Sequence, residues 1–180
     1  FNSYPQPIGK VVCGIDLGRA NDYTVATFMD SKGQIIDVYR DNLRDWSEMI
    51  QAILERVKRW NASVLIERNS IGDVIFETMK KQWSDTHPFN TSSSSKKEII
   101  EGLVMDLNEG NLLLPSEELF SPMLFELNIY EYGYSPKTRQ VTYSAPNSMH
   151  DDVVMSLAIT NYHRKQNQNY GTYAVLGSYR

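Results

Sequence analysis

Short apolar runs separated by polar turns occupy the first part of the chain. The segments 10–16, 23–29 and 34–39 are rich in strand-forming residues, and the sequence 30–33 between the last two is typical of a turn. Together they predict a three-stranded antiparallel meander. Another strand pattern, at 63–67, follows a helical segment, so we expect it to lie parallel to the first strand.

Helical spacing of apolar residues occurs in several later segments. The segment 45–60 has the strongest pattern, with Asp45 and Glu48 at capping-box spacing. The polar segment 85–95 ends in a run of serines, and Ser95 with Glu98 has capping-box spacing before a further helix. The remaining predicted helices are 72–83, 117–127 and about 150–164, the last apolar on most sides and therefore expected to be buried against the sheet.

The order of elements predicts an α/β fold with a mixed β-sheet, three antiparallel strands plus parallel strands, flanked by helices. A brief strand is expected at 111–114, and 129–134 with 140–144 predict an additional β-hairpin with a basic tip. The chain begins without Met or a signal-peptide pattern. We therefore expect one domain at 10–165, a linker from a missing N-terminal region at 1–9, and a C-terminal tail at 166–180.

Composition narrows the class of protein. The chain has 180 residues, 41% of them hydrophobic and 22% charged, which fits one folded domain and argues against disorder. Cys13 is the one cysteine, which excludes a disulfide scaffold and a cysteine-rich zinc site. No apolar run approaches the ~20 residues of a membrane helix. The net charge of −4 argues against binding nucleic acid by bulk charge, but it allows a local basic track.

Acidic residues stand at the ends of the expected core elements. Asp16 ends the first strand, Glu67 ends the parallel strand, and Asp151 and Asp152 open the last helix. If the two strands are neighbours, Asp16 and Glu67 emerge side by side, and the start of the helix can bring Asp152 to them. Carboxylates gathered at one point repel unless a cation is present, and oxygen ligands suit Mg²⁺ or Mn²⁺ rather than zinc. Two such ions can activate water and stabilise the leaving oxygen of a phosphodiester.

Each acid also has an ordinary structural explanation. Asp16 can belong to a strand-ending turn, Glu67 can open a polar loop, and Asp151 and Asp152 can simply complement the helix macrodipole. The conjunction of all of them at strand and helix ends favours the metal site.

At these residues the sequence resembles the nuclease domain of the large terminase subunit of tailed bacteriophages, an RNase H-like fold of the retroviral-integrase type. The resemblance covers about residues 9–162. Each motif alone is weakly specific, and their order is more specific. The matching motifs are Gly14-Ile15-Asp16-Leu17-Gly18 followed by Asp22-Tyr23-Thr24, then Ile66-Glu67-Arg68-Asn69 followed by Gly72, then Ala145-Pro146 leading to His150-Asp151-Asp152.

The resemblance implies a metal-dependent endonuclease that cleaves double-stranded viral DNA concatemers during genome packaging by two-metal-ion hydrolysis. By matching motif, Asp16 bridges two divalent ions, Mg²⁺ or Mn²⁺, and Glu67 and Asp152 complete the sites. Asp151 is the other acid of the His-Asp-Asp motif, and the sequence leaves its rank against Asp152 open.

Further residues belong to this expected site with less direct roles. Asp22 and His150 are expected close to the metals, although His150 can equally be an ordinary solvent-facing residue at a helix start. Basic residues are candidate contacts to DNA phosphates, against the ordinary explanation of solvated loop charge. They are Lys96, Lys97, Lys137 and Arg139.

The resemblance also implies partners and a location. These are double-stranded DNA, an ATPase motor domain N-terminal to this fragment, the portal protein and the small terminase subunit, in the cytoplasm of the infected bacterial host and without a membrane. The P-loop of such a motor is absent here, because Val11 follows Gly9-Lys10 and Tyr4 stands where the first glycine belongs.

Other functions remain open at this point. A junction resolvase or a transposase-type nuclease would share the fold. The segment 14–18 also resembles the first phosphate loop of actin-like ATPases, but the chain offers neither the second subdomain nor a second glycine-rich loop. A non-catalytic docking module that retains the fold is a further alternative.

Overall fold

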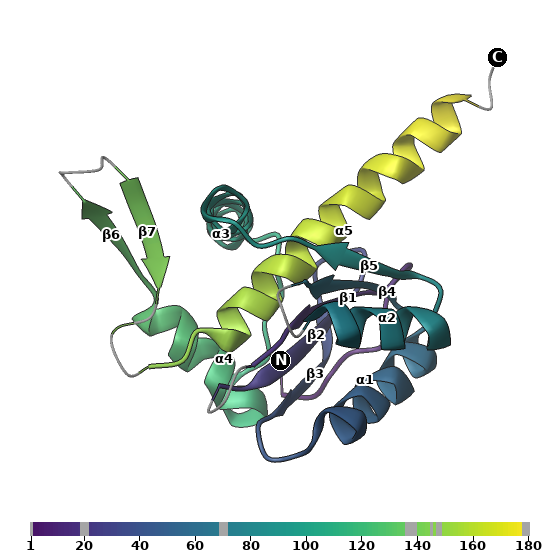
Figure 1. The fold of residues 1–180 in the computed structure, drawn as a ribbon. Coiled ribbons are helices and arrows are strands. Elements are labelled where there is room, and N and C mark those ends of the chain that lie inside the picture. Colours follow the sequence, from purple (N-terminus) through teal and green to yellow (C-terminus); the bar gives the residue numbers. More distant parts are fainter. Residues whose placement is uncertain are drawn as a thin grey trace.

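A mixed five-stranded sheet forms the centre of the molecule (Figure 1). The computed structural model describes residues 2–18, 22–68, 72–135, 140–144, 146 and 149–177, with the backbone alone at 132, 134–135, 140–144 and 169–177. The strand order is β3-β2-β1-β4-β5, with β1 at Val12–Asp16, β2 at Thr24–Met29, β3 at Ile35–Asp41, β4 at Ser63–Glu67 and β5 at Thr86–Phe89. The first three strands are antiparallel, and β4 is parallel to both β1 and β5. The predicted α/β fold with a mixed sheet is confirmed.

Helices cover both faces of this sheet. One face carries α1 (Trp46–Trp60) and α2 (Gly72–Gln82). The other face carries α3 (Ser93–Asn108), α4 (Glu117–Ile129) and α5 (Asp152–Gly177). The long helix α5 runs across this face of the sheet and continues beyond it (Figure 1). The predicted hairpin is also present, with β6 at Glu131–Ser135 and β7 at Gln140–Ser144 paired outside the main sheet.

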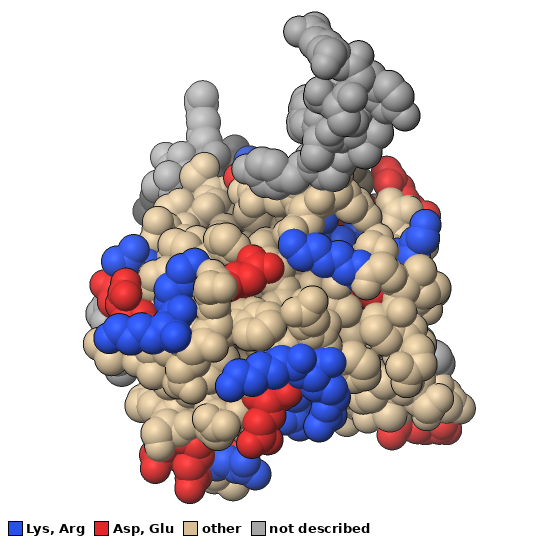
Figure 2. All heavy atoms as spheres, turned by 90° about the vertical axis from the view of Figure 1, so that its right-hand side faces the viewer, with Lys and Arg blue, Asp and Glu red and all other residues tan. Residues whose placement is uncertain are grey.

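The surface shows charges of both signs. Lysines and arginines are interspersed with acidic residues on the side of the molecule seen in Figure 2, which lies away from the beginning of α5. None of the helices in the described part of the chain combines the length and the apolar character that crossing a membrane requires.

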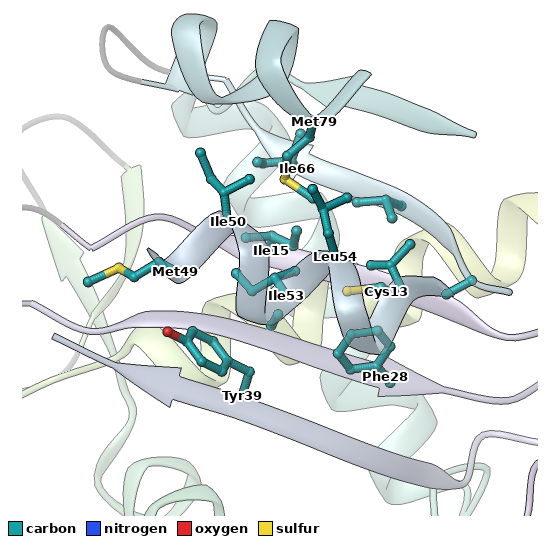
Figure 3. Close-up of a cluster of buried hydrophobic side chains, with 14 of the residues drawn as sticks. Cys13, Ile15, Phe28, Tyr39, Met49, Ile50, Ile53, Leu54, Ile66 and Met79 are labelled. Carbon is teal, nitrogen blue, oxygen red and sulfur yellow. The ribbon is translucent and has the colours of Figure 1, made fainter. Parts of the chain in front are cut away.

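The two faces of the sheet have different cores because side chains alternate along each strand. Cys13 and Ile15 of β1 point to the face under α1 and α2, where they join a large apolar cluster (Figure 3). Val12 belongs to the other cluster, which packs against α3, α4 and α5. By the same alternation, Gly14 and Asp16 face α5. The predicted functional acid of β1 therefore stands on the α5 side of the sheet.

Helix boundaries follow from capping, and one differs from the prediction. The Asp45 carboxylate caps α1 by accepting the N–H groups of Ser47 at 2.8 Å and Glu48 at 3.0 Å. The cap of α3 is Ser92 and not Ser95. Ser92 Oγ accepts the N–H of Ser95 at 3.1 Å, and Ser95 Oγ accepts the N–H of Ser92 at 2.8 Å, so a second hydroxyl plays the part expected of Glu98.

Two further predictions about secondary structure are wrong, one about a strand and one about the end of a helix. The segment 111–114 forms no strand and makes only an isolated parallel bridge between Leu113 and Gln34. The last helix was expected to end near residue 164, whereas α5 continues to Gly177. The residues after Lys165 lack apolar periodicity, but lengthening a helix that is already formed is far easier than starting one.

The sequence prediction missed β5, because the segment 85–95 was interpreted as polar; the strand, Thr-His-Pro-Phe, also contains a proline. The strand lies at the sheet edge, where a missing N–H is tolerated. The carbonyls of Asp85 and Phe89 accept backbone N–H groups of the β4 segment at 2.8 and 2.7 Å, so the alternate residues Thr86 and Pro88 direct their backbone groups outward. The Thr86 carbonyl accepts a hydrogen bond from Lys80 Nζ at 2.9 Å.

Candidate metal centre

Two neighbouring strands deliver Asp16 and Glu67 to the same end of the sheet. The parallel register pairs Ile15 with Ile66, so the acids that follow them end β1 and β4 side by side. Their side chains are hydrogen-bonded to each other. Both residues are nearly buried, with 8% and 9% of their surface exposed. The arrangement predicted from the strand ends is thus the one observed.

The start of α5 brings Asp152 to this place. Asp152 is the first residue of the helix and is only 6% exposed. Its Oδ2 accepts the backbone N–H of Tyr23 at 2.9 Å, which ties the helix start to the loop between β1 and β2. Gly18 and Asp22, on either side of residues 19–21, lie close together, since a Cβ at Gly18 would lie 2.5 Å from the carbonyl oxygen of Asp22.

Two of these carboxyl groups, Asp16 and Asp152, have a raised pKa. Burial raises the pKa of Asp16 well above its usual range, and the charges of Glu67 and Asp152 raise it further. Burial also raises the pKa of Asp152, against the lowering effect of the Tyr23 N–H. In the part of the chain that the structure describes, neither Asp16 nor Asp152 forms an ion pair with a lysine or arginine. Buried carboxylate oxygens that no lysine or arginine neutralises fit a divalent metal ion as its ligands.

A second group of possible ligands adjoins the first. His150 Nδ1 lies 3.4 Å from Asp152 Oδ2 and 3.6 Å from Asp22 Oδ1. The ligand atoms of all three residues lie within 4.8 Å of one another, so this outer group could also hold a metal ion. Asp152 belongs to both groups, since it also lies beside Asp16. The structure thus places Asp22 and His150, which the sequence analysis expected near the metals, beside Asp152.

The two adjacent acids of α5 point in different directions. Asp152 is buried in the site, whereas Asp151 is half-buried and faces α3, where Lys96 Nζ lies 3.3 Å from its Oδ2. Lys96 thus stands at the rim of the site. Lys97 instead pairs with Glu101 on α3 at 3.8 Å. The other candidate DNA contacts, Lys137 and Arg139, lie outside the described residues.

Sequence reasoning missed two residues that support the site. Glu126 of α4 accepts the N–H of Val153 at 2.7 Å and so caps the first turn of α5. Arg40 of β3 places its guanidinium 3.3 Å from the centre of the Tyr23 ring, and its Nη2 lies 3.7 Å from Glu126 Oε1. Neither residue belongs to a local motif, since each reaches the site only through the packing of α4 and β3.

Comparison with known proteins gives a consistent set of neighbours among solved structures, while no protein-family model and no curated protein matches the chain. The large terminase nuclease from thermophilic phage G20c with bound magnesium shares 27% identity with a TM-score of 0.78, over 89% of this chain and 84% of that chain. The nuclease domain of the Thermus phage P74-26 large terminase shares 26% identity with a TM-score of 0.74, over 88% and 81%. The corresponding domain from bacteriophage SPP1 with bound manganese, at 12% identity and a TM-score of 0.60 over 86% of each chain, shows the fold alone. The G20c nuclease has also been solved with cobalt and with zinc.

Proposed function

We propose that this chain, whose fold is that of the nuclease domains of phage large terminases, hydrolyses phosphodiester bonds of double-stranded DNA with bound divalent metal ions. The resemblance expected from the sequence is confirmed by these neighbours, and their metal-bound forms support a metal-dependent nuclease. One observation carries the proposal. Asp16, Glu67 and Asp152 come from three elements far apart in the chain and converge at one buried point.

The positions of the acids support distinct roles. Asp16 is influenced by the charges of both Glu67 and Asp152, so we assign it as the ligand shared between two ions, with the other two acids completing the positions. Asp22 and His150 would offer further ligand atoms next to Asp152. Two ions of Mg²⁺ or Mn²⁺ in this place would supply an activated water and stabilise the leaving oxygen. The protein's own contribution is to hold these carboxylates in a fixed, largely water-excluded arrangement.

Lys96 is the best-placed candidate for a DNA contact. Its ammonium group already lies at the rim of the site, where it neutralises Asp151. A DNA phosphate entering the site would compete for this ammonium group, and we propose that Lys96 then contacts the phosphate. Asp151 would thereby become available as a further metal ligand. Contacts by Lys97, Lys137 and Arg139 stay predictions.

The biological setting follows from the resemblance and stays a prediction. It comprises cleavage of concatemeric viral DNA during packaging, an N-terminal ATPase motor domain, and a portal protein and small terminase subunit as partners in the infected bacterial cell. Residues 10–165 as the nuclease domain, with a preceding linker and a following tail, are part of the same prediction.

Plasmid cleavage in Mn²⁺ tests the proposed function. Asp152→Asn is expected to abolish cutting while thermal unfolding shows that the domain stays folded. Glu55→Gln, on the exposed side of α1, is the control and should cut like the wild type. Full activity of Asp152→Asn would sink the assignment. Preferential cutting of four-way junctions over linear duplex would favour a resolvase, and failure to bind any divalent metal in calorimetry would favour the docking module.

A further inference from the structure

α5 approaches β1 at Gly14 more closely than a side chain would permit. A Cβ at Gly14 would lie 2.4 Å from the backbone nitrogen of Thr160 and 2.8 Å from its Cα. In the antiparallel register of β1 and β2, Gly14 is paired with Thr27. The helix therefore rests on the backbone of this strand pair.

Two hydroxyl groups of α5 bond the backbone of the Gly14–Thr27 pair on both strands. The N–H of Thr27 donates to Ser156 Oγ at 3.0 Å, and Ser156 Oγ donates to the carbonyl of Gly14 at 2.9 Å. The N–H of Gly14 donates to Thr160 Oγ1 at 3.0 Å, and Thr160 Oγ1 donates to the carbonyl of Thr27 at 3.2 Å. The hydroxyl hydrogen of Thr160 is shared between this carbonyl and that of Ser156, whose oxygen lies 2.6 Å from Thr160 Oγ1. Both hydroxyl residues are fully buried, so water does not replace these bonds if they are lost.

This contact lies next to the proposed metal ligands on both elements. Asp152 precedes Ser156 by about one helical turn, and Asp16 follows Gly14 on the same face of β1. Moving α5 along the strand by a single residue's rise, about 1.5 Å, would lengthen and misalign the hydrogen bonds that Ser156 and Thr160 make to Gly14 and Thr27. The hydroxyl contacts therefore fix where Asp152 stands relative to Asp16.

We propose that Ser156 and Thr160 are positioning residues, which hold α5 in register with β1 and so set the spacing of Asp16 and Asp152 that a metal ion requires. This inference rests on the proposed function, because it concerns how the ligands of that site are held. Groups that orient metal ligands typically contribute about 10- to 100-fold to metal affinity. We expect about a 10-fold loss when one of these hydroxyls is removed.

A matched pair of substitutions separates the hydroxyl of Thr160 from its methyl group. Thr160→Val keeps the shape and loses the hydroxyl, whereas Thr160→Ser keeps the hydroxyl and loses the methyl. Ser156→Ala provides a second variant, which removes one oxygen and creates no overlap. Mn²⁺ affinity is measured by isothermal titration calorimetry, at a temperature well below the unfolding transition of every variant. Leu54→Ala, in the core under α1, controls for loss of stability without any contact to α5.

The expected result is Mn²⁺ binding about 10-fold weaker in Thr160→Val and Ser156→Ala, and within about twofold of the wild type in Thr160→Ser and Leu54→Ala. Wild-type affinity in both hydroxyl-deleted variants would overturn the positioning role and leave the proposed metal site standing. Equal weakening in Thr160→Ser and Thr160→Val would assign the effect to packing and would overturn it as well. No Mn²⁺ binding by the wild type would overturn the proposed function and this inference together.

Discussion

Replacing Asp16 by asparagine is expected to stabilise the metal-free domain and to remove its response to metal. In the absence of metal, Asp16 is a buried acid beside Glu67 and Asp152, and its burial, followed by the charges of these neighbours, raises its pKa. Adjacent strands lie about 4.8 Å apart. Two unit charges at about 5 Å repel by roughly 3 kcal/mol at an effective dielectric constant near 20. Because the pKa of Asp16 is raised, partial protonation of this residue relieves part of the repulsion, so we expect a net gain of about 1–2 kcal/mol at pH 8.

Thermal unfolding in EDTA and in Mn²⁺ measures both effects. For a domain of this size, 1 kcal/mol corresponds to a shift of about 2–4 °C. Asp16→Asn should therefore unfold about 2–8 °C above the wild type in EDTA. In Mn²⁺ at 100 times its dissociation constant, the wild type gains about 2.7 kcal/mol, and the order of the two proteins reverses.

The control is Asp151→Asn. Asp151 is half-buried and paired with Lys96, and its charge acts on Asp16 less than those of Glu67 and Asp152 do, so its removal should raise the unfolding temperature in EDTA less than Asp16→Asn does. If Asp16→Asn unfolds below the wild type in EDTA at pH 8, the acids do not repel one another as argued. The case for a site that requires a cation would then be lost.

The remaining predictions concern packing, pH and DNA. Gly14→Ala should lose about 1–3 kcal/mol in chemical denaturation, because its methyl group would overlap the α5 backbone, whereas Gly102→Ala, with open space around it on α3, should gain up to about 1 kcal/mol; the reverse order would contradict this packing. Burial lowers the pKa of His163 to about 4. Below about pH 6.5, His163 therefore becomes protonated in the unfolded chain but stays neutral in the folded domain, which favours unfolding. The wild type should therefore lose about 3 kcal/mol more than His163→Gln as the pH falls from 6.5 to 4, and parallel stability curves would refute this. Lys96→Gln should weaken DNA binding and reduce the slope of log affinity against log salt by about 0.9, with a smaller change in Lys97→Gln, and equal slopes in all three proteins would refute a phosphate contact by Lys96.

The meeting of Asp16 and Glu67 could be predicted because each follows a short apolar run that is clearly a strand. β1 and β4 end on Asp16 and Glu67, and the helix between the strands makes them parallel, so both acids arrive at one end of the sheet. The choice between Asp151 and Asp152 could not be made in this way. Adjacent helical residues differ by about 100° in direction, and only the packing of α5 shows that Asp152 is buried while Asp151 meets α3.

Other features have no local signal at all. Arg40 and Glu126 support the site from elements whose position depends on the whole fold. His163 belongs to no motif in the sequence, and its Nε2 lies 3.0 Å from Ser63 Oγ, 100 residues away at the start of β4. The cap of α3 at Ser92 was misplaced because several serines in a row offer equivalent hydroxyls, and the competition between them is decided by geometry.

The outer edge of β5 gives another protein chain little to pair with. Pro88 has no N–H to donate, and the Thr86 carbonyl is already bound by Lys80. Unpaired backbone groups at a strand edge can pair with the same edge of another copy, and repeated pairing leads to aggregation. Proline and lysine at an edge oppose such pairing. Pro88, which makes β5 hard to recognise in the sequence, therefore opposes polymerisation of the folded domain through the outer edge of β5 at high protein concentration.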